Sequence, residues 1–314
     1  LDTVSSIEAM QEGRVRVFVS MGGNFVRAVP DPDYTERAMR KLDLNVQVST
    51  KLNRSHIVVG RTSLILPCLG RTEKDVQASG EQCVSVEDAM AMVHHSYGMK
   101  RPASPHLKSE MAILGGMARA TLPDSPTPYE AYVDDYDAIR DVMAQVLPGF
   151  EDFNRRVRLP TGFRIHQPAR ELDYSKTSTG RANFSTAPLP QVEPGPGRLL
   201  LQTMRSHDQW NTTIYSNNDR YRGVKNIRTL VFMNPEDMRE RGIDGGQLVD
   251  ITATSRLGIR RRLEKYRAFA YNTPKGSAAG YMPEMNVLIG IEDYSTQSEQ
   301  PLMKNIRVEI EPSR

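Results

Sequence analysis

Hydrophobic residues in the first part of the chain alternate between runs typical of strands and spacing typical of helices. The strand-like runs lie at residues 14–20, 44–48 and 63–66. Between the first two, apolar residues recur at helical spacing over 34–42, directly after the helix-start signal Asp31-Pro32-Asp33. This order of strand, helix and strand predicts a parallel sheet with crossover helices, and hence a Rossmann-like α/β domain.

Three more helices are expected further along this part of the chain. Residues 85–93 begin with Ser85 as N-cap and carry Asp88 three positions later, which is a variant of the capping box. Residues 109–122 and 136–146 have apolar side chains spaced so that one face of each helix is buried.

The composition changes at residues 187–197, where four of eleven residues are prolines. Such a segment cannot form a helix interior or a central strand, so we expect an extended linker. Beyond it, short apolar runs predict a small β-barrel with mixed connections, with strands at 199–203, 229–233, 247–252 and 307–310 and a helix at 235–241. The expected division is 1–187 for a partial α/β domain, 188–197 for the linker and 198–314 for the barrel.

The composition excludes several classes of protein. A net charge of +3 implies no general attraction to nucleic acid. The sequence contains no run of about 20 apolar residues, which a membrane-spanning helix would need. The two cysteines, Cys68 and Cys83, cannot form a disulfide framework or hold an iron–sulfur cluster, so we expect a reduced, cytoplasmic protein. The basic run at 256–267 is expected to be a solvated barrel hairpin, because no aromatic platform accompanies it. The first residues, Leu1-Asp2-Thr3, show neither an initiator methionine nor a signal peptide, which favours a fragment or a processed chain.

The segment 203–213 is the richest in hydrogen-bonding side chains and contains the only tryptophan. Its candidate binding residues are Arg205, His207, Asp208, Gln209, Trp210, Asn211 and Thr212. An arginine offers a planar fork of donors and amides read the edges of heterocycles, so this set suits a ligand rich in phosphate or ring nitrogen. A polar surface loop is the alternative interpretation.

Two further segments carry candidate binding residues. The turn Gly22, Gly23 and Asn24 follows the first strand, at the edge of a parallel sheet where ligands bind and where glycines let a phosphate approach the backbone. Thr50, Lys51 and Arg54 form either a capped surface turn or a group that neutralises a pyrophosphate, and the residues favour neither interpretation.

Small residues at 276–280 lie in a third segment, 271–286, and permit a flat ligand to approach the backbone closely. Asn286, at the end of this segment, has an amide that can read a heterocycle edge.

Together these segments resemble the molybdopterin-dependent oxidoreductases of the formate dehydrogenase and nitrate reductase superfamily, in their C-terminal half. Residues 203–213 are similar to the pterin-contacting loop that opens the last domain, and residues 18–31 to the strand and loop beside a guanine dinucleotide. Residues 50–56 and 64–75 resemble the branch of formate dehydrogenase-like alpha subunits. The likeness extends from about Thr3 to Glu311.

The resemblance implies a double-psi β-barrel and a cofactor in which two molybdopterin guanine dinucleotides hold molybdenum or tungsten. The α/β domain would hold the nucleotides, and the barrel would cap the pterins, with Asn286 and Lys304 lining one of them. The implied activity is a two-electron oxidation or reduction of a small-molecule substrate. No residue is identified as catalytic or as a ligand of the metal.

The resemblance also implies a partner, either a missing N-terminal half or a separate catalytic or electron-transfer subunit. Any iron–sulfur cluster is expected in that N-terminal part, and the present residues alone are expected to bind the cofactor weakly or not at all. Three alternatives are a noncatalytic scaffold subunit of a split enzyme, an inactive truncated product, and a barrel that has taken up an unrelated ligand.

Overall fold

The computed structural model describes residues 2–314 and divides into two compact units. The first unit contains residues 2–66 together with 190–314, and the second contains residues 67–189. Residues 2–66 therefore pack with the barrel and not with residues 67–187. The division expected from the sequence instead grouped residues 1–187 as one domain. That division concerned cofactor-binding domains and stays a prediction.

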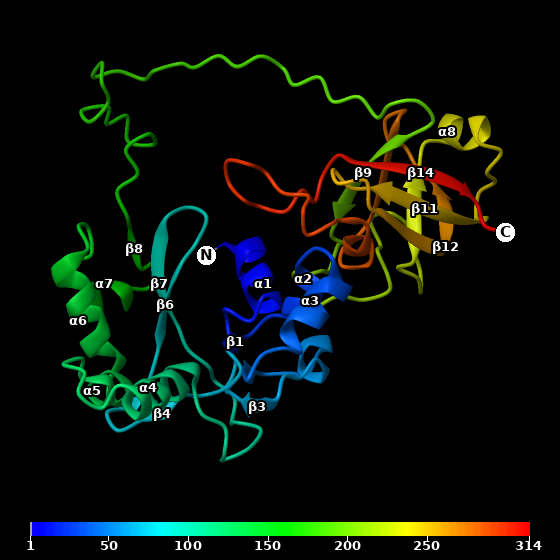
Figure 1. The fold of residues 1–314 in the computed structure, drawn as a ribbon. Coiled ribbons are helices and arrows are strands. Elements are labelled where there is room, and N and C mark those ends of the chain that lie inside the picture. The colour runs from blue at the N-terminus through cyan, green and yellow to red at the C-terminus, as the bar shows by residue number, and fades with distance from the viewer. Residues whose placement is uncertain (1) are drawn as a thin grey trace. The chain divides into compact units, whose positions relative to one another are not determined.

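The α/β part of the first unit is built on a small sheet with strand order β1-β2-β3 (Figure 1). Its elements in chain order are α1 (Thr3–Gln11), β1 (Val17–Met21), α2 (Phe25–Ala28), α3 (Pro32–Met39), β2 (Leu44–Ser49), η1 (Arg54–Ile57) and β3 (Thr62–Pro67). β1 and β2 pair in parallel, with Val17 opposite Leu44 and Met21 opposite Val48, so the predicted parallel sheet is confirmed. The helices bury their apolar faces in one cluster, which includes Ile7, Met39 and, from the barrel side of the unit, Ile291.

The second part of this unit is a closed barrel of six strands in the order β10-β12-β11-β14-β9-β13. Its elements are β9 (Leu199–Met204), β10 (Leu230–Met233), α8 (Pro235–Glu240), β11 (Leu248–Thr254), β12 (Arg260–Ala270), β13 (Ser277–Tyr281), η2 (Glu284–Leu288) and β14 (Ile306–Pro312). Two neighbouring pairs, β10 with β12 and β13 with β9, are parallel, and the other four are antiparallel. The mixed connections expected from the sequence are thus confirmed, whereas the double-psi crossing stays a prediction.

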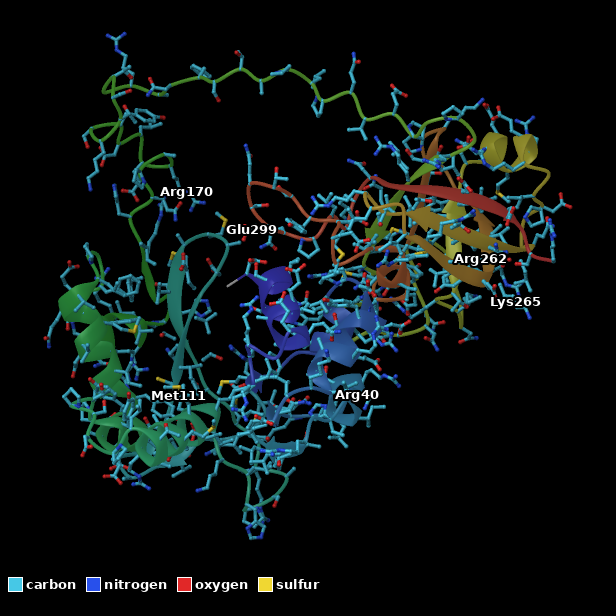
Figure 2. All side chains as sticks on the ribbon, viewed as in Figure 1. Arg40, Met111, Arg170, Arg262, Lys265 and Glu299 are labelled. Atoms are coloured by element: carbon cyan, nitrogen blue, oxygen red, sulfur yellow. The ribbon has the colours of Figure 1, made fainter. Side chains whose placement is uncertain are left out.

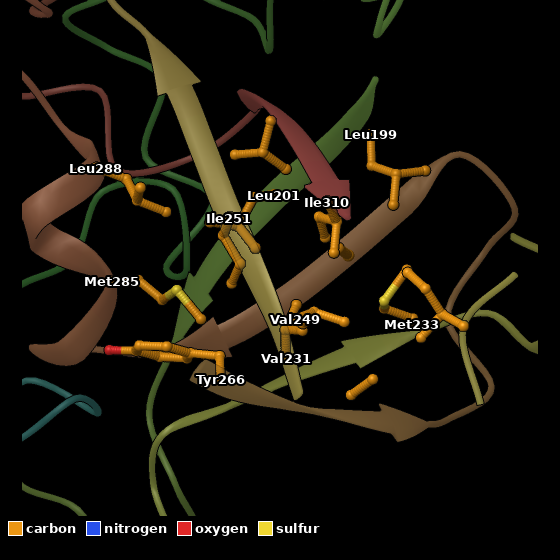
Figure 3. Packing of buried hydrophobic residues seen from close by; sticks show 14 of the residues in the cluster. Leu199, Leu201, Val231, Met233, Val249, Ile251, Tyr266, Met285, Leu288 and Ile310 are labelled. Atoms are coloured by element: carbon orange, nitrogen blue, oxygen red, sulfur yellow. The ribbon is translucent and has the colours of Figure 1, made fainter. Parts of the chain in front are cut away.

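Alternation of side chains explains why the barrel closes. β9 shows the inward and outward alternation of a strand with one buried face, so Leu199 and Leu201 point into the core. Figure 3 shows Leu201 beside Ile251, and Met285 of η2 next to Tyr266 at one end of the core. β12 is the longest strand among the described residues, but the sequence analysis did not predict it as a strand. Its outward-facing residues are charged, so they appeared in the sequence as a basic run. Arg262 and Lys265 both lie on it (Figure 2).

Buried polar contacts join the α/β part to the barrel within the first unit. The Asn286 amide donates to the carbonyls of Arg27 at 2.9 Å and Val29 at 3.4 Å. Arg261 forms ion pairs with Asp31 at 2.5 Å and Glu292 at 3.3 Å, and its side chain is only 13% exposed. The expectation of a solvated hairpin is therefore wrong for Arg261, because acidic groups on both sides of the joint draw it into the interior.

The second unit contains short strands and helices around a small aromatic core of Val93, Phe153, Val157 and Phe163. Its elements are β4 (Val76–Gln77), β5 (Gly80–Glu81), β6 (Val84–Glu87), β7 (Met92–Ser96), α4 (Glu110–Thr121), α5 (Tyr129–Asp134), α6 (Tyr136–Val146), α7 (Phe153–Val157) and β8 (Phe163–Arg164). The helices expected at 109–122 and 136–146 are confirmed as α4 and α6.

The helix expected at 85–93 is wrong, because these residues form the antiparallel hairpin of β6 and β7. Asp88 does not cap a helix; its carboxylate accepts from the backbone N–H groups of Met90 and Met92 and so closes the turn. Ala91 has a positive φ of 61°, which a helix interior does not allow. Valines at 84, 86 and 93 favour the strand conformation that the capping signal concealed.

Between β8 and β9 the described chain has no helix or strand, as expected for the proline-rich segment. Across residues 2–314, no helix is both long enough and apolar enough to span a membrane.

The joint at Arg261 generates a stability prediction. Arg261→Ala leaves two buried carboxylates without their partner, so we expect the free energy of unfolding to fall by roughly 2–4 kcal/mol. Arg260→Ala is the matched control, since its side chain is 68% exposed and lies 3.8 Å from Glu309. That change is expected to cost about 0–1 kcal/mol. Urea unfolding followed by Trp210 fluorescence measures both, and equal losses would contradict the role of the buried joint.

Candidate functional site

The glycine turn after β1 meets the barrel loop at a direct hydrogen bond. Gly22 and Gly23 have φ of 71° and 78°, a region that favours glycine, and they turn the chain into Asn24. The buried Asn24 amide donates to the carbonyl of Thr212 at 3.1 Å and accepts from the Ser55 hydroxyl at 3.1 Å. Two predicted binding segments that are far apart in sequence are therefore in contact.

Three arginines surround one carboxylate beside this turn. Arg54 lies 3.0 Å from Glu36, Arg40 lies at 3.8 Å and Arg27 at 4.0 Å. The hydrogen bond and charge of Glu36 raise the pKa of Arg54 above its ordinary value. Three guanidinium groups share a single negative charge, so the cluster carries a surplus of positive charge.

An open cleft of about 480 Å³ lies where the glycine turn, the arginines and the barrel loops meet. Its lining comes from both parts of the first unit and consists of Asn24, Arg27, Asn53, Arg54, Thr212, Thr213, Tyr215, Leu263, Tyr266, Pro283, Glu284 and Val287. Three of the residues expected from the sequence, Asn24, Arg54 and Thr212, are thus brought together here.

The loop after β9 contains the other predicted residues, which differ in their exposure and in their contacts. Trp210 and Asp208 are exposed, Arg205 bonds to Asn211, and the Arg205 guanidinium lies 6.0 Å from the Trp210 ring. His207 is different, since its ring lies 3.6 Å from the ring of Tyr221 and its Nε2 accepts from Arg220 at 2.6 Å.

Gln209 is turned inward. It is 8% exposed, its Oε1 accepts from the Ser206 N–H at 2.9 Å, and its Nε2 donates to the carbonyls of Asn211 and Met282 at 2.7 Å each. This side chain therefore holds the shape of the loop from within.

Four other candidate residues do not line the cleft. Thr50 and Lys51 lie on the exposed turn after β2. Asn286 is fully buried in the joint described above, and its Oδ1 has no partner among the described residues. The Lys304 ammonium donates to the carbonyl of Thr203, at the base of the loop after β9. Their roles in binding stay predictions.

The sequence analysis missed Arg228, which is buried behind the loops. Its guanidinium pairs with Glu284 at 2.6 Å and lies between the rings of Tyr215 and Tyr281, at 4.3 and 4.7 Å from their centres. A lone arginine before an apolar strand gives no signal of such a role, because its partners come from distant segments. Arg27 and Tyr215 were missed for the same reason.

A second buried carboxylate, Asp219, supports the same region. It accepts from Tyr281 at 2.9 Å and pairs with Arg222 at 2.5 Å. Burial opposes its ionisation, but these two hydrogen bonds outweigh burial and lower the pKa of Asp219. Burial and the Asp219 carboxylate together raise the pKa of Tyr281. The pair is therefore an ionised acceptor and a neutral donor at ordinary pH.

Comparison with known families concerns the barrel first. Residues 199–307 match the family described as the molydopterin dinucleotide binding domain. This part of the chain is similar to molybdopterin dinucleotide-binding domains, so the resemblance of the last domain to molybdopterin-dependent proteins is confirmed.

The whole chain has relatives named as oxidoreductases. It is 50% identical over 317 residues to an uncharacterized oxidoreductase of Mycobacterium tuberculosis, in a match that covers 99% of this chain and 41% of the relative. It is 41% identical over 315 residues to the protein YdeP of Escherichia coli, again with 99% and 41% coverage. The chain therefore spans about two fifths of the length of these relatives. The acetylene hydratase of Pelobacter acetylenicus has a similar fold, with a TM-score of 0.59 at 10% identity over 99% of this chain and 46% of the hydratase.

Proposed function

We propose that the chain supplies the part of a molybdopterin-dependent oxidoreductase that holds one guanine dinucleotide of the cofactor, and that the cleft is the place where the nucleotide binds. The observation that carries the proposal is the meeting of Asn24, Arg54 and Thr212 at one cleft. Two of these come from the segments that resemble the nucleotide-binding region, and the third from the matched barrel domain.

The charge at the cleft suits a diphosphate. Arg27 lies 4.0 Å from Glu36, beyond hydrogen-bond range, so its donors remain available, and Arg54 lines the same cleft. Two guanidinium groups can bind a diphosphate through charge-assisted hydrogen bonds. The exposed ring of Tyr215 supports stacking of a base, because every base has a π-face.

The cofactor itself, with molybdenum or tungsten, would supply the two-electron chemistry when bound. The residues of this chain would orient it: Arg27 and Arg54 at the diphosphate, and Asn24 and Thr212 by fixing the wall of the cleft. The exposed side chains of the loop after β9, among them Arg205 and Trp210, are proposed to face the pterin. An iron–sulfur cluster needs about four thiolates and would require residues other than these 314.

A formate dehydrogenase-like activity is the finer proposal. It rests on the likeness of residues 50–56 and 64–75, since the names of the relatives specify no substrate. Because a hydratase has a similar fold, the fold alone does not determine which reaction is catalysed.

We expect the cofactor-loaded whole protein to reduce a viologen dye with formate. If the dye is reduced with another small substrate but not with formate, formate is rejected as the substrate and the proposal of an oxidoreductase stands.

The cleft yields a prediction that uses guanosine diphosphate as the probe. Arg54→Ala and Arg27→Ala should each weaken its binding about tenfold, which corresponds to about 1.4 kcal/mol, because each removes a charge-assisted contact. Arg40→Ala is the matched control: it removes a third arginine from Glu36 but not from the cleft lining, and should change affinity less than twofold. Calorimetric titration measures all four proteins. Equal weakening by Arg40→Ala would show that only the general charge matters, and affinity left unchanged by both Arg54→Ala and Arg27→Ala would reject the proposed site.

The partner proposal rests on the open side of the small sheet. β1 is an edge strand, and its side chains Val17, Val19 and Met21 are 54%, 44% and 42% exposed. Edge strands with apolar side chains favour pairing with further strands. We propose that the region present in the longer relatives, and outside the match to this chain, covers β1. A separate subunit of a split enzyme is the alternative occupant.

Val19→Asp tests this surface. In the chain alone the side chain is exposed, so stability should change by no more than about 0.5 kcal/mol. Association with the separately expressed remaining region of the Mycobacterium tuberculosis relative should be lost. Leu257→Asp is the control, since Leu257 is 70% exposed on the hairpin between β11 and β12. Co-purification that survives Val19→Asp would contradict the assignment of β1 as the contact.

A further inference from the structure

The guanidinium of Arg228 has no donor left for a ligand. Its Nε donates to Glu284 at 2.6 Å, and its Nη1 donates to the Ser206 hydroxyl at 3.0 Å and the Ser216 carbonyl at 3.4 Å. Its Nη2 donates to Glu284 at 3.1 Å, Gln209 at 3.1 Å and the Met282 carbonyl at 2.8 Å. An arginine has five N–H donors, so all of them are satisfied within the chain.

These acceptors belong to separate loops that all reach the cleft. Ser206, Gln209 and Ser216 lie along the long connection between β9 and β10, and Met282 and Glu284 follow β13. The bond from Gln209 to the Asn211 carbonyl passes the constraint on to Thr212, which lines the cleft.

We infer that Arg228 is a positioning residue that assembles the ligand-facing loops before any ligand binds. Its guanidinium carbon lies over the rings of Tyr215 and Tyr281, so the connection after β9 and strand β13 both fix its position. Loops that are ordered in advance bind a ligand at lower entropic cost. The consequence for the cofactor rests on the proposed function, whereas the ordering of the loops does not.

A lysine cannot replace this arginine, because an ammonium has three donors and no plane to fit between two rings. Glu284, whose side chain is only 18% exposed, would lose its bidentate partner. The same reasoning makes the methionine variant a stronger perturbation, since it removes every donor while keeping much of the volume.

Trp210 provides a reporter in the affected loop, as the single tryptophan of the chain and the neighbour of Gln209. In Arg228→Lys, the fast component of its time-resolved fluorescence anisotropy should grow, and binding of guanosine diphosphate should weaken about tenfold. Arg228→Met should change both in the same direction and further. Arg262→Lys is the matched control, because Arg262 is an ion-paired arginine of the same barrel, bound to Asp250 and Glu311.

Measurements are made at a temperature where far-ultraviolet circular dichroism shows each variant folded. Unchanged anisotropy and affinity in Arg228→Lys, or equal changes in Arg262→Lys, would overturn the inference. Should both Arg228 variants unfold, Glu284→Gln keeps the volume and one acceptor; it should show a smaller change in the same direction, and an unchanged loop would overturn the inference. If Arg54→Ala and Arg27→Ala leave the affinity for guanosine diphosphate unchanged, the proposed function fails, while the anisotropy still decides the positioning role.

Discussion

The buried ion pair between Arg228 and Glu284 is the contact on which the candidate site depends. A charge taken out of water is costly unless its partners are fixed and complete, and Arg228 meets this condition with two carboxylate oxygens, two hydroxyl or amide oxygens and two carbonyls. The pair therefore imposes one arrangement on loops that would otherwise have many. The cleft wall formed by Tyr215, Pro283 and Glu284 is a consequence of that arrangement.

A second set of buried charges gives the site its other wall. Arg261 joins the barrel to Asp31, the last residue of the segment that contains the glycine turn, and Asn286 bonds to the backbone of Arg27 and Val29. These contacts hold the surplus positive charge of the Glu36 cluster against the barrel loops. The proposed binding mode thus depends on geometry: a cationic edge and a polar loop are fixed at one cleft by Arg228, Arg261 and Asn286, which do not line it.

Patterns in the sequence predicted those helices and strands whose formation depends mainly on the spacing of nearby apolar residues and on capping residues. The helices α4 and α6 and most strands of the barrel follow from apolar spacing, and α3 from its proline and aspartate start signal. The hairpin of β6 and β7 was mistaken for a helix because Ser85 and Asp88 mimic a cap, while the pairing that overrides them is with residues up to Ser96. β12 was hidden by its charged outer face. The contact of Asn24 with Thr212 was not predicted, and Arg228 could not be found, because both depend on segments that are distant in sequence and meet only in the fold.

The central claim is that the cleft lined by Asn24, Arg54 and Thr212 holds the nucleotide end of the cofactor. Hydrogen–deuterium exchange of the chain, with and without saturating guanosine diphosphate, tests it most directly because it locates the ligand without requiring activity. The account predicts slower exchange in peptides that contain residues 22–28, 53–57 and 210–216, and no change in the peptide that contains 256–262. Protection of other segments, with these three unchanged, would contradict it.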